Sequence, residues 1–331
     1  MSAKYSRIIS TGSALPAARI TNEDLARRLA ADGIETSDEW IRTRTGIEAR
    51  RFVNGTTETT TTLAAAAAQK ALEGGGVDPK TIDLIIVATT TPDQVFPSTA
   101  AAVQRLIGAA GCAAFDVQAV CAGFIYALNA ADAMLRAGPY QRALVIGAET
   151  MSRVIDMKDR ATCVRCGDGA GAVVLEASAK PGILAARMYA DGSYDENVLG
   201  LTARIDHGEL CGRPYINMDG RQVFKLAVDG LTSSAQEVAV LAGVDPQDVD
   251  VYIPHQANLR IMTMVAKKLG IPDERMIKTV SEQGNTSAAS VPLALDEAVR
   301  SGKISDGSLV LLQAVGAGMA WGSAIVRWRS E

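Results

Sequence analysis

The amino-acid sequence predicts an α/β protein made of two related halves, each built around its own sheet. Two segments nearly repeat: "GVDPKTIDLIIVA" begins at Gly76 and "GVDPQDVDVYIPH" begins at Gly243, 167 residues further along. Each is a turn followed by a run rich in β-branched residues, which is typical of a strand. The apolar runs at 142–148 and 309–315 are separated by the same interval. Strands that alternate with helices of about 12–17 residues favour buried, mostly parallel sheets covered by helices.

The repeat divides the chain into halves at 1–180 and 181–331. The helix-like "AGFIYALNAADAMLRAG" from Ala122 corresponds to "TSAASVPLALDEAVRSG" from Thr286. Such matches indicate that the second half repeats the order of elements of the first. The polar stretch 34–60 is expected to be an insertion in the first half. The polar stretch 186–222 is expected to be a long loop between the halves.

The composition is that of a globular protein without a marked charge. Of 331 residues, 48% are hydrophobic and 21% are charged, and the formal net charge is −4. This weak negative charge gives no sign of binding to nucleic acid or an anionic membrane, so neither is expected as a partner. The first ten residues lack the apolar core of a signal peptide, and no stretch approaches the ~18 apolar residues of a membrane span. Five irregularly spaced cysteines favour a reducing compartment, and a cytoplasmic protein is expected.

Cys121 follows the strand-like run "AAFDVQAV" and opens the helix that is predicted from Ala122. The residues alone leave two interpretations open. Cys121 is either a small buried side chain, as free cysteines usually are, or a nucleophile at a helix N-terminus. Because unpaired N–H groups and the helix dipole favour the thiolate, the second interpretation predicts a lowered thiol pKa. Gly123 would allow a substrate or another backbone segment to come close.

Two polar residues of the second half are candidates for the same site. His255 follows a predicted strand and is either a structural histidine or an acid–base group, whereas His207 lies in a polar loop and is expected to be exposed. Asn285 precedes the second-half helix, where an N-cap is an ordinary role for asparagine. The repeat interval carries Cys121 to position 288, within three residues of Asn285. Because sites in open α/β sheets lie beyond the carboxyl ends of strands, the duplication would bring these residues to one axis.

Three other motifs are not assigned a function. Cys163 and Cys166 have CxxC spacing, but no second pair or nearby histidine completes a zinc site, and no metal is expected. "GDGAG" at 167–171 resembles part of a dinucleotide fingerprint, but a strand-like run follows it where a phosphate loop would open a helix. We interpret this segment as a tight turn. The sequence contains no GxxxxGK[ST] phosphate loop.

The cysteine at a first-half helix, the "HQAN" histidine and the asparagine of "GNTSAAS" together resemble the thiolase-fold condensing enzymes, specifically β-ketoacyl-[acyl carrier protein] synthase III. The resemblance covers essentially the whole chain, in this order: "TSDEWIRTRTGI", "FPSTAA", "AVCAGF", "GDGAGAVVL", "VFKLAV", "HQANLRI" and "GNTSAAS". Elongating synthases of this fold use two histidines with the cysteine, and thiolases use a second cysteine near the C-terminus. Here the third position is Asn285, and "AVGAGMAWGSA" contains no cysteine. The resemblance implies a thiolase-like fold in which the two α/β halves form a five-layer αβαβα arrangement.

The same resemblance implies a catalytic trio of Cys121, His255 and Asn285. Cys121 would accept an acyl group from a short acyl-CoA primer, which is a substrate, and no cofactor is expected. His255 and Asn285 would stabilise the enolate that forms when malonyl-[acyl carrier protein] loses CO₂. Attack of this enolate on the acyl-cysteine would give a β-ketoacyl-[acyl carrier protein] and initiate fatty-acid synthesis. A related acyltransferase or a condensing enzyme of secondary metabolism is the alternative.

Binding roles follow from the same resemblance. Trp40 and Arg44 correspond to the pair that holds the CoA adenine, and Arg160 corresponds to the arginine that completes this clamp. A basic patch for the acidic carrier protein would comprise Lys225, Arg260, Lys267 and Lys268. Phe96 resembles the residue that enters the acyl pocket of the partner in the family's homodimers. The alternatives are a half-buried loop anchor for Trp40 and a merely solvated face for the basic residues.

The sequence departs from the family around the acyl pocket and the loop at 315–318. The residue before "GDGAG" is usually aromatic, but here it is Cys166, preceded by Arg165. Met157 replaces a usual tryptophan, and Ala317 lies within the glycine-rich loop, whose N–H groups would join that of Cys121 in holding a tetrahedral oxyanion. We expect Cys166 to leave a roomier acyl pocket that accepts primers longer or more branched than acetyl.

Overall fold

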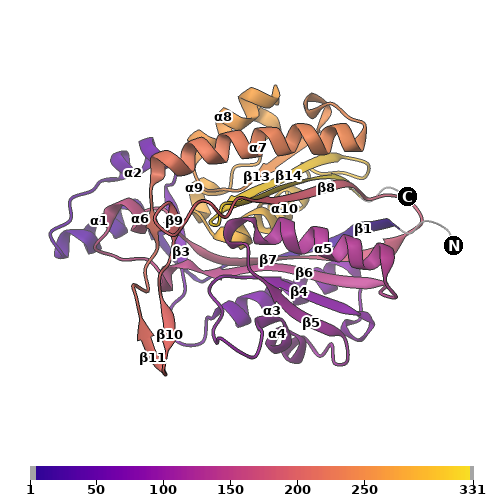
Figure 1. The fold of residues 1–331 in the computed structure, drawn as a ribbon, viewed down its shortest axis with the longest axis horizontal. Helices are drawn as coiled ribbons and strands as arrows, with labels where there is room; N and C mark the ends of the chain where they lie inside the picture. Colours follow the sequence, from indigo (N-terminus) through magenta and orange to yellow (C-terminus); the bar gives the residue numbers. More distant parts are fainter. Residues whose placement is uncertain (1–4, 329–331) are drawn as a thin grey trace.

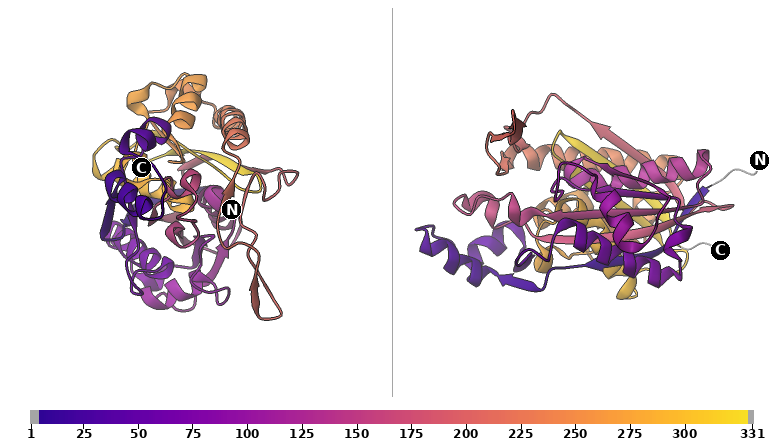
Figure 2. Two further views of the ribbon diagram at one scale, coloured as in Figure 1. Left: turned by 90° about the vertical axis from the view of Figure 1, so that its left-hand side faces the viewer. Right: turned by 90° about the horizontal axis from the view of Figure 1, so that it is seen from below.

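Two sheets alternate with three layers of helices in the computed structural model of the protein (Figures 1 and 2). The structure describes residues 5–328. The outermost residues of the two predicted halves, 1–4 and 329–331, lie outside the described residues. The strands of the first sheet lie before the predicted boundary at 180/181, and those of the second sheet lie after it.

The first sheet has five strands, in the order β1 (Tyr5–Ala14), β7 (Asp168–Ser178), β6 (Arg142–Thr150), β4 (Leu84–Ala88) and β5 (Ala113–Val117). The central strand β4 pairs in parallel with β5 and with β6, whereas β7 is antiparallel to β6 and to β1. Every residue of β4 is buried, which agrees with its continuous apolar sequence.

The second sheet repeats this order. Its strands are β8 (Ile183–Ala190), β15 (Ala320–Arg327), β14 (Leu309–Gly316) and β13 (Val251–Pro254). The strand β13 is parallel to β14, and β15 is antiparallel to β14 and to β8. A single parallel bridge between Tyr252 and Met276 takes the place that β5 has in the first sheet.

Two helices lie between the sheets and two cover each outer face. The central helices are α5 (Gly123–Ala137) and α10 (Ser290–Arg300), and the outer helices are α3 (Thr60–Gly75), α4 (Thr99–Ile107), α7 (Gly220–Ala242) and α8 (Leu259–Leu269). In Figure 1 the layers run from α3 and α4 at the bottom to α7 and α8 at the top. The predicted thiolase-like fold, with two α/β halves in five layers, is therefore confirmed.

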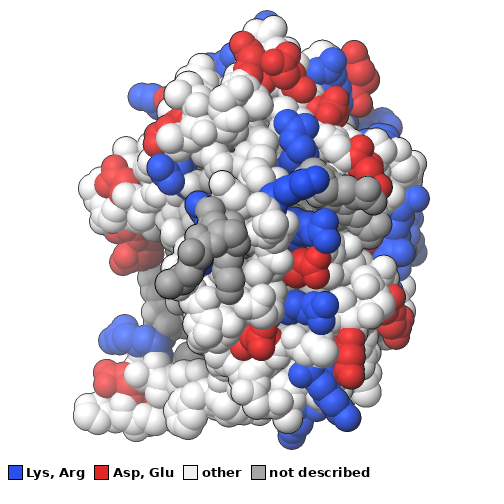
Figure 3. Space-filling view, turned by 90° about the vertical axis from the view of Figure 1, so that its right-hand side faces the viewer, with Lys and Arg blue, Asp and Glu red and all other residues white. Residues whose placement is uncertain are grey.

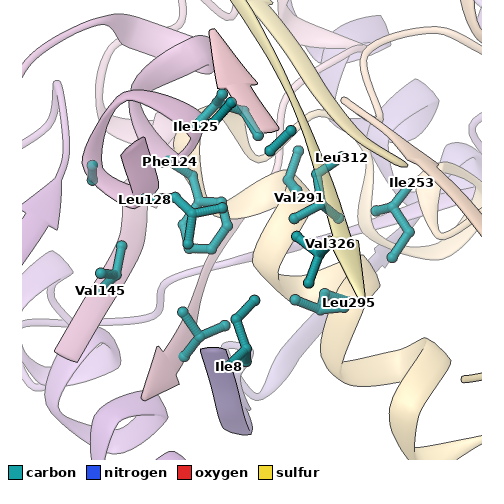
Figure 4. Close-up of a cluster of buried hydrophobic side chains, with 14 of the residues drawn as sticks. Ile8, Phe124, Ile125, Leu128, Val145, Ile253, Val291, Leu295, Leu312 and Val326 are labelled. Carbon is teal, nitrogen blue, oxygen red and sulfur yellow. The ribbon is translucent and has the colours of Figure 1, made fainter. Parts of the chain in front are cut away.

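The middle layer holds the halves together through one continuous apolar core (Figure 4). Phe124, Ile125 and Leu128 of α5 pack in the same cluster as Val291 and Leu295 of α10, all of them essentially inaccessible to solvent. Burial of apolar side chains of this size contributes roughly 1.5–3 kcal/mol each. The relative position of the two halves, and with it the site that they share, is set by this shared core.

The two halves also repeat in their backbone details. The 3₁₀ helices η1 (Pro79–Thr81) and η4 (Pro246–Asp248) precede equivalent strands. Val120 and Ser287, which are 167 residues apart, have positive φ angles of 47° and 49°. Positive φ is uncommon for residues other than glycine and is often found at functional sites. Each of the two stands at the start of a short turn that leads into a central helix.

The structure corrects the interpretation of "GDGAG". Residues 168–171 are the start of β7 and do not form a tight turn. The glycines serve close packing, because a Cβ on Gly171 would lie 2.6 Å from the carbonyl carbon of Pro292 in α10. Small residues in this strand allow the central helix to approach the sheet closely. The segment therefore shares the glycine-rich composition of a turn, but its role is to pack against a helix.

Smaller elements surround one end of the molecule. They are β2 (Ala18–Thr21), α1 (Asn22–Ala31), α2 (Asp38–Thr45), β3 (Ala49–Phe52), η3 (Met151–Arg153), α6 (Arg160–Cys163), β9 (Leu199–Gly200), β10 (Arg204–Asp206), β11 (Glu209–Cys211), β12 (Asn217–Met218) and α9 (Val280–Gln283). The 3₁₀ helix η5 (Asp273–Arg275) lies elsewhere, where Arg275 donates to the carbonyl oxygens of Gln247 and Val249 just before β13. The stretch 186–222, expected to be a long loop, contains the end of β8 and the projecting hairpin β10–β11 seen in Figure 1. His207 lies at the tip of this hairpin and is exposed, as expected.

The opposite end carries the first and last described residues. Lys and Arg side chains lie there among Asp and Glu, so this face carries mixed charge (Figure 3). One ion pair of this region joins Arg7 of β1 to Glu176 of β7 at 2.8 Å. Within residues 5–328, no helix is long and apolar enough to cross a membrane.

Candidate active site

A cavity of about 630 Å³ brings the predicted trio together. Cys121 of the first half and His255 and Asn285 of the second half all line its wall. The larger part of the lining surface is apolar, which suits an acyl chain, and the three polar groups converge on one region. Cys121 meets His255 and Asn285, which are 134 and 164 positions further along the chain, because both halves direct their strand and helix ends to one axis.

Cys121 lies in the 3₁₀ helix η2 (Val120–Ala122), directly before α5. Its position after a strand and at a helix N-terminus agrees with the sequence prediction, although α5 itself begins one residue later than expected, at Gly123. The side chain is buried but forms part of the cavity wall. A Cβ on Gly123 would meet Ala88 and Ala288, so this glycine allows the two halves to approach closely beside the cysteine.

The predicted lowering of the thiol pKa is wrong for this structure. Burial raises the pKa of Cys121 to about 12, and the nearby buried carboxylate of Glu149 acts in the same direction. A hydrogen bond with the side chain of Ser287 lowers the pKa, but by less. Desolvation therefore outweighs the helix N-terminus, and the thiol carries its proton at neutral pH. Its use as a nucleophile requires a group that accepts this proton.

His255 directly follows β13 and is fixed through its backbone. Its N–H donates to the carbonyl oxygen of Gln313 at 2.8 Å, and its carbonyl oxygen accepts from the N–H of Ala257 at 3.0 Å. Burial lowers the pKa of the imidazole to about 4, so the ring is neutral at neutral pH. Nδ1 is buried without a hydrogen-bond partner. A neutral imidazole has one N–H to donate, so His255 is suited to donating a hydrogen bond and is a weak base.

Asn285 is held on both sides by one neighbouring segment. Its N–H donates to the carbonyl oxygen of Arg165 at 2.8 Å, and its carbonyl oxygen accepts from the N–H of Gly167 at 2.9 Å. Its side-chain Oδ1 accepts from the N–H of Ser287 at 2.8 Å. This last bond occupies the oxygen and leaves the amide Nδ2 to donate. Asn285 is not the N-cap of α10, which is Ala289, but its side chain bonds to the turn before α10 and offers a donor on the cavity wall.

The loop 315–318 lies against the backbone of Cys121. A Cβ on Gly316 would be 2.6 Å from the Cys121 nitrogen and 2.9 Å from the carbonyl oxygen of Ala119. Only glycine permits this approach, because a larger residue would push the two backbone segments apart. Ala317 of the same loop lines the cavity. The predicted neighbours in an oxyanion site, the Cys121 N–H and this loop, are thus in contact.

The three residues predicted to hold adenine also come together. The guanidinium carbon of Arg44 lies 4.5 Å from the ring centre of Trp40, and that of Arg160 lies 4.3 Å from it. Arg160 also donates to the carbonyl oxygen of Glu35 at 2.6 Å. Arg44 is exposed and lines the cavity, so the cluster stands where the cavity opens to solvent. Trp40 is half-buried, as both interpretations of this residue allow.

The predicted basic patch spans two adjacent helices. Lys225 lies on α7, and Arg260, Lys267 and Lys268 lie on α8, and all four are exposed. Of these, Arg260 lines the cavity, whereas Lys268 pairs with Asp229 at 3.4 Å.

Phe96 and Cys166, the two predicted acyl-pocket residues, differ in position. Cys166 is buried, lines the cavity and forms a parallel bridge with Asn285. Burial raises its pKa to about 12, and the nearby Cys121 acts in the same direction. Phe96 is 82% exposed on the surface of this chain. Its predicted role concerns the pocket of a partner and stays a prediction.

Sequence reasoning missed several residues of the site. Phe224 and Leu231 of α7 contribute to the apolar wall, and Thr90 and Thr91 contribute a polar part of it. Glu149 lies behind these threonines, fully buried. One signal could have revealed it, since a glutamate near the end of the apolar strand "RALVIGAET" must be satisfied by hydrogen bonds or remain uncharged.

Comparisons with known proteins agree with this geometry. Residues 115–192 match the family model of 3-oxoacyl-[acyl-carrier-protein (ACP)] synthase III, and residues 240–328 match the C-terminal model of the same family. The 3-oxoacyl-[acyl-carrier-protein] synthase III of Aquifex aeolicus VF5 is 47% identical, with 98% of this chain and 100% of that chain covered and a TM-score of 0.90. The corresponding enzyme of Thermus thermophilus is 40% identical over 97% and 99% of the chains, with a TM-score of 0.89.

A relative from secondary metabolism is somewhat more distant in sequence. The priming β-ketosynthase of the R1128 polyketide pathway is 36% identical over 98% and 97% of the chains, with a TM-score of 0.92. The fold therefore does not separate the two kinds of enzyme, but sequence identity favours the synthases of fatty-acid synthesis. The chain belongs to the 3-oxoacyl-[acyl-carrier-protein] synthase III family and is an acyltransferase that carries out the initiating condensation of fatty-acid synthesis.

Proposed function

We propose that Cys121, His255 and Asn285 divide the two half-reactions of this condensation between the two halves of the chain. The observation that carries the proposal is their convergence on one cavity wall, with Nδ2 of Asn285 left as a donor by the bond from Ser287. In the first half-reaction, the sulfur of Cys121 attacks the thioester carbon of an acyl-CoA and CoA leaves. The backbone N–H of Cys121 and one of the loop 315–318 hold the resulting oxyanion.

In the second half-reaction, malonyl-[acyl carrier protein] loses CO₂. Negative charge then develops on its thioester oxygen, and we assign its stabilisation to the imidazole N–H of His255 and the Nδ2 of Asn285. Preorganised donors of this kind are worth on the order of 3 kcal/mol each in a site that excludes water. The enolate carbon then attacks the acyl-Cys121 carbonyl and forms the β-ketoacyl product. This scheme uses side chains and backbone alone, so we propose no cofactor.

We further propose that Trp40, Arg44 and Arg160 hold the adenine of the acyl-CoA. The ring of Trp40, with two guanidinium groups close to it, offers a flat stacking surface, and a purine could replace one of the two. The polar contact between Asn258 Nδ2 and the Arg44 carbonyl oxygen, 3.1 Å, ties this cluster to the helix that follows His255. Binding at the clamp would therefore place the thioester end of the molecule toward the cavity.

The carrier protein is proposed to dock over α7 and α8. Lys225, Arg260 and Lys267 are exposed there, and Arg260 also reaches the cavity, so an acidic partner bound at these residues would be close to the route that its prosthetic arm must follow. Attraction between this patch and an acidic carrier would chiefly accelerate association and would weaken as salt concentration rises.

We propose a homodimer formed through β5 and the loop that contains Phe96. The strand β5 is at the edge of the first sheet, and all five of its residues are only partly buried. Val95 and Phe96 are 75% and 82% exposed, which is unusual for side chains of this kind outside an interface. A surface hollow of about 900 Å³ lies beside them, lined in part by Pro97 and Leu106.

We propose the reducing cytoplasm as the setting of this protein. Its five cysteines are all unpaired, which fits such a compartment.

The test of the proposed function is mass spectrometry of the intact protein and its peptides after mixing with a panel of acyl-CoAs. We expect one acyl group on Cys121, discharged only by malonyl-[acyl carrier protein] with release of CO₂. Discharge by other nucleophiles without CO₂ would favour simple acyl transfer. No modification by any primer would contradict the role of Cys121. The acyl-CoA that reacts fastest identifies the primer.

A further inference from the structure

Gln256 is a buried glutamine just past the end of β13, and the proposed half-reactions do not use it. Its side-chain amide makes four hydrogen bonds, all of them with backbone groups. Nε2 donates to the carbonyl oxygens of Pro254 at 2.8 Å and Ile277 at 3.0 Å. Oε1 accepts from the N–H groups of Thr279 at 2.8 Å and Val280 at 3.1 Å. Both N–H donors and both lone pairs of the amide are therefore used.

These bonds stand where the first sheet has a further strand. In the first sheet, β4 pairs with β5 along its whole length. Beside β13, the pairing is centred on Tyr252, which forms the bridge with Met276 and accepts from the N–H of Ile277 at 2.9 Å. The strand β13 then ends at Pro254, which has no N–H to offer a neighbouring strand. The side chain of Gln256 takes the place of the missing backbone pairs.

Gln256 connects the two segments that carry the enolate donors. It directly follows His255, so its bonds also fix the backbone next to the imidazole. Its Oε1 accepts from two N–H groups at the start of α9, whose N-cap Thr279 has no capping bond from its own side chain. The helix α9 is followed by Gly284 and then by Asn285. One amide thus joins the residue after one donor to the short helix that leads to the other.

The backbone of Gln256 adds a third connection. Its N–H donates at 2.7 Å to the hydroxyl of Ser290, the first residue of the central helix α10, and both residues are buried. Asn285 has a separate support, because its backbone is paired with that of Arg165 and Gly167. Each donor therefore has its own anchor, and Gln256 fixes the distance between the two anchors.

We propose that Gln256 is a positioning residue that keeps the imidazole of His255 and the amide of Asn285 directed to one thioester oxygen. This inference rests on the proposed function, in which these two side chains stabilise the enolate. Donors of a charge that develops only in the transition state must be aligned before it forms, so a small displacement is costly. The hydrogen bonds of Gln256 all go to second-half segments. Its loss should therefore impair decarboxylation and spare acylation of Cys121.

The test compares Gln256→Met with the wild type in both half-reactions. Methionine has a similar length but no amide, so all four side-chain bonds are lost. Acylation is measured in a single turnover with the fastest primer from the panel above, and malonyl decarboxylation is measured in a Cys121→Ala background. We expect decarboxylation to fall at least ~30-fold through kcat, with KM for malonyl-[acyl carrier protein] within about twofold. Acylation should stay within about threefold of the wild type.

Nuclear magnetic resonance of ¹⁵N-labelled histidine follows one donor directly. The chain has two histidines, and His207 is exposed at the tip of its hairpin, so the signals of His255 are readily assigned. Burial lowers the pKa of the His255 imidazole to about 4 in the wild type. In Gln256→Met we expect shifted or broadened ring signals and titration at a higher pH, because a displaced ring is better solvated.

Ser323→Ala is the matched control for lost buried hydrogen bonds. Ser323 lies in β15 of the same sheet, away from the cavity wall, and its hydroxyl bonds with Ser234 at 2.7 Å and with Nε2 of Gln313 at 2.8 Å. We expect a lower free energy of unfolding, an unaltered His255 spectrum and an unchanged ratio of the two half-reactions. Gln256→Glu is the conservative variant. A buried, protonated carboxyl group keeps the acceptor and one donor, so decarboxylation should fall only about tenfold.

The outcomes distinguish this inference from the function on which it rests. A selective loss of decarboxylation with a changed His255 spectrum supports the positioning role. Equal losses in both half-reactions, decarboxylation within about threefold of the wild type, or an unaltered His255 spectrum would each overturn it while the proposed function stands. If Gln256→Met does not fold, the same comparison with Gln256→Glu decides. A wild type that no primer acylates, or that releases no CO₂ from malonyl-[acyl carrier protein], overturns the proposed function and this inference together.

Discussion

In the first half, the turn before α5 places Cys121 against the end of β14, where Gly316 has no side chain. In the second half, the equivalent turn before α10 places Ser287 against the end of β6, where Glu149 occupies the position equivalent to Gly316. The backbone is nearly the same, as the positive φ angles of Val120 and Ser287 show. One strand end thus packs closely against the backbone of Cys121, and the other supplies a buried carboxylate beside Ser287.

At a second pair of equivalent positions, one half again has a small residue and the other half a polar side chain. His255 follows β13 in the second half, and the residue 167 positions earlier is Ala88, at the end of β4. Ala88 is fully buried against Gly123, whereas His255 lines the cavity. The duplication therefore supplies two sets of strand ends, and in the proposed mechanism single side chains decide which set carries the nucleophile and which set stabilises charge.

The largest expected effects come from separating the two half-reactions. Cys121→Ala should lose condensation by at least ~1000-fold but keep malonyl decarboxylation, because its second-half donors remain. Asn285→Asp keeps an oxygen for the Ser287 N–H but loses the Nδ2 donor, so it should be acylated normally and decarboxylate at least ~100-fold more slowly. Mass spectrometry of Cys121 and CO₂ release measure the two steps. Loss of acylation in Asn285→Asp would contradict this division.

The close packing of Gly316 against the Cys121 backbone can be tested next. In Gly316→Ala, the new Cβ would lie 2.6 Å from the Cys121 nitrogen, so the loop must move away and the oxyanion donors separate. We expect single-turnover acylation to fall about 100-fold, the effect of losing one such donor. Gly192→Ala is the matched control, because its Cβ would meet nothing within 4 Å. Normal acylation of Gly316→Ala would show that this loop does not hold the oxyanion.

Burial of His255 makes the second half sensitive to acid. Its pKa is about 4 in the folded protein against 6.5 for a free imidazole, so the unfolded chain binds a proton that the folded chain does not. Stability from this group is complete above pH 6.5 and falls as pH decreases toward 4, by about 2 kcal/mol between pH 7 and pH 5. Urea unfolding of the wild type and His255→Gln at these two pH values measures the difference. An equal pH dependence in both would contradict the neutral, buried state of His255.

The fold was largely predictable because the repeat consists of short sequence segments that recur at a fixed interval. The turns "GVDP" at Gly76 and Gly243 recur because each ends a long helix in a left-handed conformation and begins the next strand, and the structure shows both. The interpretation of "GDGAG" was wrong for a physical reason. A strand packed closely against a helix and a tight turn both require glycine, so composition alone does not separate them.

The convergence of Cys121, His255 and Asn285 on one cavity was predictable from the sequence, but the electrostatics of that cavity were not. Cys121, His255 and Asn285 could be identified from position and resemblance, because each follows a strand or precedes a helix at the shared axis. The direction of the Cys121 pKa depends on burial and on the charge of Glu149, which is 28 residues away in the sequence and accepts a hydrogen bond from Ser287 of the other half. Neither the depth of the cavity nor a hydrogen bond across 138 residues is visible in a local pattern.

The smallest expected effect concerns the wall that the two halves share, where Cys166 of the first half pairs with Asn285 of the second. In Cys166→Phe, the larger ring should fill part of the cavity and lower kcat/KM for long or branched acyl-CoAs about tenfold relative to acetyl-CoA, a typical effect of pocket size. Cys166→Ala is the control and should keep the wild-type order of primers, since it adds no volume. A panel of primers with all three proteins measures this order. A wild type already strict for acetyl-CoA would mean that residues other than Cys166 limit the pocket, and that the departure from the family's aromatic residue at this position leaves primer choice unaltered.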